Sequence, residues 1–175
     1  MATTYTLINS NTLGSNAASV TFSSIPSTYT DLVLRASIRS AGAGADGGLV
    51  IFNNDDASTN YSLTWIRGTG ATASTSRLSS RATGNFTFNL VDNSNNLANT
   101  YSLLHLYIPN YTASTNKPWC AFLATENNSA STDINLETNA GLWRITTAIS
   151  TITIKMSSQN LASGSSFYLY GIKNS

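Results

Sequence analysis

The sequence predicts an all-β protein, an antiparallel β-sandwich, and three observations point to that fold class. Lys, Gln and Glu, whose long straight side chains favour exposed helices, number only three, one and two among the 175 residues. Ser, Thr and Asn account for 70 residues, and β-branched and aromatic residues suited to a pleated surface are plentiful. Apolar and polar residues also alternate with a period of two between turn clusters rich in Gly, Asn and Ser.

The alternation places the strands one by one. It is clearest over 31–40, where Leu32 and Leu34 fall on one face and Arg35 and Ser37 on the other. We expect strands near residues 3–9, 18–24, 31–40, 48–53, 61–67, 84–91, 100–108, 118–125, 132–138, 149–156 and 166–172. Residues 41–48, 68–76 and 92–96 are expected as loops, and residues 144–149 as a short helical or 3₁₀ turn.

Four segments are apolar at consecutive positions instead of alternating: 49–52, 103–108, 119–123 and 167–170. Such runs indicate central strands, or strands whose outer face meets a partner. Short strands at this spacing favour a jelly roll of about 8–10 strands, with a small barrel as the alternative. No linker or break in composition divides the chain, so we expect a single domain over residues 1–175.

Composition also bears on function. A net charge of +1 argues against attraction to nucleic acid or an anionic membrane, and 41% apolar residues argue against disorder. The sequence shows no apolar run long enough to cross a bilayer and no signal-peptide pattern at its start. One cysteine and one histidine are too few for an internal disulfide or a metal cluster. We therefore expect no cofactor and no enzymatic activity.

Three places could still carry chemistry. Asp55 and Asp56 could offer oxygen ligands to calcium, but a solvated turn with side-chain-to-backbone hydrogen bonds is the favoured interpretation. His105 would have to be the base of any Ser–His system, and an ordinary strand histidine is favoured. Cys120 lies between Trp119 and Ala121, which predicts a buried small hydrophobe.

Aromatic and arginine side chains are the remaining candidates for binding. On an outer surface, Tyr61, Trp65, Tyr107, Tyr111, Trp119 and Trp143 could stack on sugars, but most are expected in the core. Arginines outnumber lysines six to three, and arginine is favoured at protein interfaces. We predict an interface at Arg35 and Arg39, assigned to one outward strand face, and at Tyr107 and Tyr111.

Several stretches resemble a group of small Ser/Thr/Asn-rich virion proteins of tailed bacteriophages, particularly phages of marine bacteria and cyanobacteria. The stretches are Ser24–Leu34, Phe52–Asp56 with Asn60-Tyr-Ser, Arg67-Gly-Thr-Gly70, Tyr107–Lys117, Ala140–Trp143 followed by Thr147–Ile154, and Leu169–Ser175. The resemblance spans nearly the whole chain. It implies an exterior structural component of the virion and brings no catalytic residues.

The resemblance implies a capsid cement or decoration protein that binds the major capsid protein and stabilises the shell. We also expect association with itself as a homotrimer or other homo-oligomer, because this would cover exposed strand edges, at the virion exterior after synthesis in the host cytoplasm. An uncharged hydroxyl and amide surface suits this setting, because it is insensitive to the salt concentration around the particle. The alternative is a tail fibre or tail-associated protein that binds a receptor or glycan.

Overall fold

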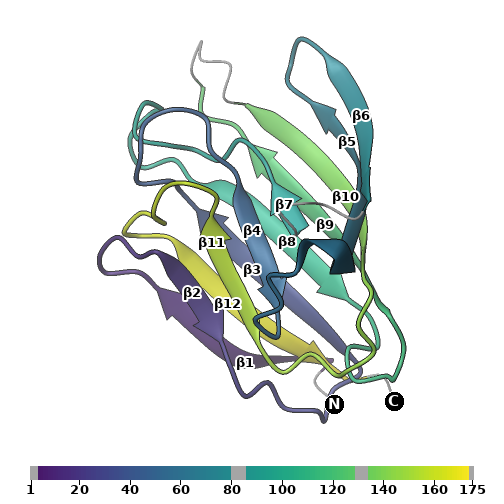
Figure 1. Ribbon diagram of the computed structural model, residues 1–175. Helices are drawn as coiled ribbons and strands as arrows, with labels where there is room; N and C mark the ends of the chain where they lie inside the picture. Colours follow the sequence, from purple (N-terminus) through teal and green to yellow (C-terminus); the bar gives the residue numbers. More distant parts are fainter. Residues whose placement is uncertain (1–3, 80–85, 129–133, 174–175) are drawn as a thin grey trace.

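Two antiparallel β-sheets face each other in the computed structural model, which describes residues 4–79, 86–128 and 134–173 (Figure 1). The larger sheet has eight strands in the order β1-β12-β3-β8-β9-β10-β5-β6, and the smaller has four in the order β2-β11-β4-β7. The strands are β1 (Tyr5–Thr12), β2 (Ser19–Phe22), β3 (Asp31–Ile38), β4 (Gly48–Phe52), β5 (Tyr61–Gly68), β6 (Ala73–Ser79), β7 (Phe86–Phe88), β8 (Ser102–Ile108), β9 (Lys117–Thr125), β10 (Asn135–Trp143), β11 (Ile152–Met156) and β12 (Ser166–Ile172). The predicted fold class, an antiparallel β-sandwich, is confirmed.

The chain crosses between the sheets as it does in a jelly roll. From β2 it passes to β3, back to β4, then to the β5–β6 hairpin, to β7 and to β8. Four further strands, β1, β9, β10 and β12, widen the larger sheet, so the described chain has twelve strands instead of about 8–10. The hairpin of β5 and β6 extends beyond the smaller sheet (Figure 1).

The core lies between the two sheets and is built from the inward positions of alternating strands. The larger sheet contributes Leu32, Leu34, Ile38, Leu104, Leu106, Phe167 and Leu169, and the smaller contributes Val50, Phe52, Ile152 and Ile154, each at most 1% exposed. Burying one such side chain stabilises the fold by about 1.5–3 kcal/mol relative to leaving it in water. The period-two pattern that predicts these strands is therefore also the pattern that fills the core.

The four segments predicted as central strands all have a strand neighbour on each side. Residues 49–52 lie in β4, 103–108 in β8, 119–123 in β9 and 167–170 in β12, and none of these strands forms a sheet edge. Three of them also leave a large apolar side chain exposed on the outer face, namely Leu103, Phe122 and Tyr168. The prediction of central strands is thus confirmed, and the prediction that their outer face meets a partner stays a prediction.

Strand β6 was predicted as part of a loop. Its sequence, Ala73-Ser-Thr-Ser-Arg-Leu-Ser79, lacks apolar alternation because β6 is an edge strand whose residues from Ala73 to Arg77 are exposed. Its place is fixed by pairing with β5, from Gly68 opposite Ala73 to Ser62 opposite Ser79. Hydrogen bonds between backbone groups hold β6 in the sheet, and they leave no pattern in the side chains. The sequence therefore gives no sign of this strand.

The helical turn predicted over residues 144–149 is wrong. Backbone groups of this segment bond to distant partners instead: Arg144 N donates to Asn60 O at 2.8 Å and Ile149 N to Tyr111 O at 3.0 Å. The only helical turn among the described residues is the 3₁₀ element η1 (Ser58–Asn60). No helix in that part of the chain is long and apolar enough to cross a bilayer.

Strand β10 runs five residues past the predicted end at residue 138. The reason is that its inward positions carry polar residues, so the expected apolar alternation is missing. Strand β7 is shorter than predicted, with bounds Phe86–Phe88. Residues 3, 84–85 and 132–133 of the predicted strands lie outside the described residues.

Candidate functional site

From Asn135 to Asn139, strand β10 has polar side chains at every inward position and Leu136 on the outside. Asn135, Glu137 and Asn139 are buried at 1–3% exposure, whereas Leu136 is 58% exposed. Strand β3 has the ordinary arrangement, with Leu34 buried and Arg35 exposed. Since apolar burial stabilises a fold, this reversal removes apolar area from the core and places it on the surface.

Strand register gathers the outward apolar side chains of four strands into one stripe. Residues directly opposite each other in an antiparallel pair share a face. One row runs from Leu136 through Ala124 to Leu103, and the next runs from Ile66 through Thr138 to Phe122. We call Ile66, Leu103, Phe122 and Leu136 the apolar stripe, and the surface of the larger sheet that carries it the outward face.

All four side chains of the apolar stripe are well exposed: Ile66 by 54%, Leu103 by 49%, Phe122 by 39% and Leu136 by 58%. The outward face is also hollowed beside them. One hollow of about 310 Å³ is lined by Ile66, Phe122, Leu136 and Thr138 among others. A second, of about 420 Å³, is lined in part by Thr64, Cys120 and Ala140. Contiguous exposed apolar area of this kind marks binding surfaces in monomeric proteins.

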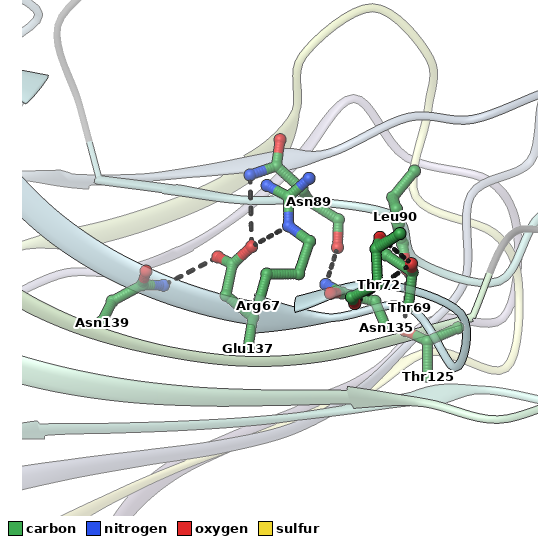
Figure 2. Close-up of polar contacts among 9 residues, drawn as sticks. All are labelled: Arg67, Thr69, Thr72, Asn89, Leu90, Thr125, Asn135, Glu137 and Asn139. Carbon is green, nitrogen blue, oxygen red and sulfur yellow. Dashed lines mark hydrogen bonds and ion pairs between the residues drawn. The ribbon is translucent and has the colours of Figure 1, made fainter. Parts of the chain in front are cut away.

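Behind the stripe, on the inward side of β10, a polar network holds β5 and β10 together (Figure 2). The Glu137 carboxylate accepts hydrogen bonds from Arg67 Nε at 2.9 Å, Asn139 Nδ2 at 2.9 Å and Asn89 Nδ2 at 3.4 Å. Asn135 Nδ2 donates to the Asn89 carbonyl at 2.7 Å. The carboxylate is therefore compensated by a cation and by amide donors, as a buried charge requires.

The network also fixes the position of a tryptophan. The Arg67 guanidinium carbon lies 4.5 Å from the centroid of the Trp65 ring, a cation–π contact. Arg67 thus links Trp65 on its own strand to Glu137 on β10, which Arg67 faces in the register. These contacts make the polar interior a supporting structure beneath the apolar stripe.

Two of the four predicted interface residues lie on the outward face. Arg35 is exposed on β3, with its guanidinium carbon 5.8 Å from the centroid of the Tyr5 ring. Tyr107 lies half-buried on β8 and its hydroxyl donates to Asp31 Oδ2 at 2.9 Å. Burial, with this hydrogen bond, raises the pKa of Tyr107.

The other two predicted interface residues have structural contacts. The Arg39 guanidinium donates to the carbonyls of Thr100 at 2.7 Å and Asn93 at 2.6 Å, which holds the chain between β7 and β8 in place. Tyr111 is fully buried and its hydroxyl donates to the Pro26 carbonyl. Arg39 lies one residue beyond β3, so the two arginines do not share an outward strand face.

His105 and Cys120 both lie on the outward face. In the register, His105 stands between Arg35 on β3 and Phe122 on β9. Burial, together with the Arg35 guanidinium, lowers the pKa of His105 below its usual 6.5. Cys120 is exposed, so its prediction as a buried residue is wrong. Its neighbour Trp119 points inward, and a strand sends adjacent side chains to opposite faces.

The loop that holds Asp55 and Asp56 forms the predicted side-chain-to-backbone turn. Asp55 Oδ1 accepts from Ala57 N at 3.0 Å, while Oδ2 accepts from Asn60 Nδ2 at 2.9 Å and Trp143 Nε1 at 2.7 Å. Asp55 therefore anchors a buried tryptophan. Across residues 4–79, 86–128 and 134–173, no group of three or more His, Cys, Asp or Glu side chains is placed to hold a metal ion.

Most of the aromatic residues named from the sequence lie in the core, as predicted. Tyr61, Tyr111, Trp119 and Trp143 are at most 3% exposed, and Phe52, Tyr61 and Trp143 contact one another. Trp65 and Tyr107 are half-buried. The exposed aromatic side chains of the larger sheet are instead Tyr5, Phe122 and Tyr168.

The sequence did not identify the apolar stripe as a site. A useful signal was present in β8 and β9, where apolar residues at consecutive positions left Leu103 and Phe122 outside. Leu136 gave no such signal, because a single Leu among polar residues suggests an inward side chain.

No model of a known protein family matches this sequence, and no curated protein matches it either.

Proposed function

We propose that this chain is a structural protein of a tailed-phage virion, a capsid decoration or cement protein that binds the major capsid protein through the outward face. The observation that carries the proposal is the apolar stripe, four exposed side chains placed side by side on four neighbouring strands. Covering the exposed part of each side chain would contribute roughly 1 kcal/mol, so the four together would contribute roughly 4 kcal/mol per copy. Repeated over every copy on a shell, that gain becomes large.

The stabilising mechanism would be mass action. A protein that binds the assembled shell and not its dissociated subunits shifts the equilibrium toward the shell. The composition, rich in Ser, Thr and Asn, agrees with this role, because hydroxyl and amide contacts change little with salt and leave any salt dependence to the few exposed charges. Neighbouring copies, as a homotrimer or another homo-oligomer, would meet at the two edges of the larger sheet, β1 and β6.

The test uses particles from which the chain has been deleted, heated with and without added protein. We expect the wild-type chain to raise the temperature at which the shells disrupt. The double variant Phe122→Ser/Leu136→Ser should fold normally and leave that temperature unchanged, because both side chains lie outside the core. Equal disruption temperatures with and without the wild-type chain would contradict the proposal, and binding at the tail alone would favour adhesion to the host.

A further inference from the structure

Two exposed arginines stand at opposite sides of the apolar stripe. Arg35 lies on β3 and Arg77 on β6, with β8, β9, β10 and β5 between them. Five strand spacings of about 4.8 Å put the two strands roughly 24 Å apart. The outward positions of the four intervening strands, all within the described ranges, carry no carboxylate, and the nearest exposed one, Glu126, follows β9 and lines a hollow at the end of the stripe with Leu136.

Most of the carboxylates are buried, including Asp31, which is covered on β3 beside the Tyr107 hydroxyl. Of the seven carboxylate residues within the described ranges, Asp31, Asp46, Asp92 and Glu137 are at most 7% exposed. Arg35, Arg77, Arg144 and Lys173 are all exposed, whereas the exposed acidic residues there are Asp56 and Glu126. Among the described residues, the exposed charges are therefore mainly basic.

We infer that the surface docking on the outward face is a protein surface with an apolar centre flanked by carboxylates, which pair with Arg35 and Arg77. This inference rests on the proposed function and specifies the chemistry of the shell surface that the chain recognises. The apolar stripe supplies the area removed from water, while the two guanidinium groups set the register of docking and accelerate association. Arginine suits this role because its planar guanidinium binds a carboxylate through two hydrogen bonds.

A second copy of this chain fits the outward face less well. A two-fold axis along the strands, between β9 and β10, would place β3 of one copy over β6 of the other, so that Arg35 would meet Arg77. A two-fold axis across the strands would place each β3 over its own counterpart, so that like charges again face each other. Such pairs oppose association, whereas an acidic partner is attracted at both sides.

The test measures the Kd of the chain for purified shells at 50 and 300 mM NaCl. Arg35→Glu and Arg77→Glu should each weaken binding at low salt by roughly tenfold, and the double variant should invert the salt dependence seen for the wild type, because carboxylates would then face carboxylates. The matched control is Lys155→Glu, the same charge reversal on β11 of the smaller sheet. We expect its Kd to stay within about twofold of the wild-type value.

The outcomes separate this inference from the proposed function. Shells that fail to bind the wild-type chain contradict both. Two results overturn only the inference that the partner is acidic. One is wild-type binding that is insensitive to salt, and the other is a loss of affinity for Lys155→Glu as large as that for the two arginine variants. Sedimentation of the free chain measures whether it forms a dimer in solution. A dimer that Phe122→Ser dissociates would show that a second copy of this chain covers the outward face, and would also overturn the inference.

Discussion

Two regions of the larger sheet differ in what they place inside: strands β3 and β8 have apolar side chains at their inward positions, whereas the segment Asn135–Asn139 of β10 has polar ones. In β3 and β8, Leu34, Leu104 and Leu106 are at most 1% exposed on the inward face. In β10, Glu137 takes the inward position and Leu136 the outward one, at 58% exposure. Strands β3 and β8 follow the rule that apolar burial stabilises a fold, and this segment of β10 departs from it.

The reversed arrangement in β10 shows that the apolar stripe on the outward face is not explained by the stability of the fold. A strand with Leu inside and Asn outside would add to the core, so stability alone does not account for β10. The network around Glu137 makes the reversed arrangement tolerable, because every charge in it is paired. The polar interior of β10 and the apolar stripe outside it therefore belong to one arrangement. The following substitutions test it.

The largest difference in stability should come from the same substitution, Leu to Ala, made in each of the two regions. Leu106→Ala leaves a cavity in the core and should lower the free energy of unfolding by about 3 kcal/mol. Leu136→Ala should change it by less than about 0.5 kcal/mol, because the side chain already lies mostly in water. Urea unfolding of both variants measures the difference. Equal losses would mean that Leu136 belongs to the core and that the two regions are alike.

Arg67→Met should have the next largest effect. The variant leaves the Glu137 carboxylate, whose side chain is 0% exposed, without its cation, at an expected loss of about 3 kcal/mol. The control is Arg77→Met on the neighbouring strand, where the arginine is exposed, with an expected change below about 0.5 kcal/mol. Urea unfolding measures both variants. Equal losses in the free energy of unfolding would show that the network around Glu137 does not support the fold.

Gly141 marks the place where the inward side of β10 changes from polar to apolar. A Cβ added there would lie 1.8 Å from Trp119 Cζ2, so the buried ring would have to shift, and Gly141→Ala should destabilise the fold by about 2 kcal/mol. Gly68→Ala on β5 is the control, since no atom lies within 4 Å of its added Cβ. Thermal unfolding compares them, and a Gly141→Ala variant as stable as the control would be the contrary result.

The smallest effect concerns pH and the outward face. His105 has a lowered pKa in the folded chain, so below the usual 6.5 the unfolded chain binds more protons and acid favours unfolding. From pH 7 to pH 5 the wild type should lose roughly 0.5 kcal/mol or less relative to His105→Gln. Urea unfolding across this range provides the measurement. A wild type that gains stability relative to the variant in acid would show a raised pKa instead.

The fold was predictable because period-two alternation is strong wherever apolar residues face the core. It gave β3 and β11 within a few residues, and consecutive apolar positions identified the central strands. The pattern failed for β6, whose residues are mostly exposed, and for the last five residues of β10, whose inward side is partly polar. In both strands the pairing of backbone groups sets the structure, and side-chain pattern carries little of that information.

The candidate site was predictable only in part. Arg35 and Tyr107 lie on the outward face, whereas Tyr111 is in the core and Arg39 binds backbone carbonyls. A sequence does not reveal register between strands, and register alone brings Ile66, on β5, and Phe122, on β9, into adjacent positions across β10. The same limit concealed the exposure of Cys120, since its apolar neighbours suggested burial without indicating which face it occupies.

The most direct test of the central claim, that the outward face is the docking surface, is electron cryomicroscopy of particles carrying the chain, at a resolution that shows side chains. The account predicts copies at symmetric positions on the shell, with Ile66, Phe122 and Leu136 buried against the major capsid protein and carboxylates opposite Arg35 and Arg77. Copies attached by another surface, with the apolar stripe open to solvent, would contradict it.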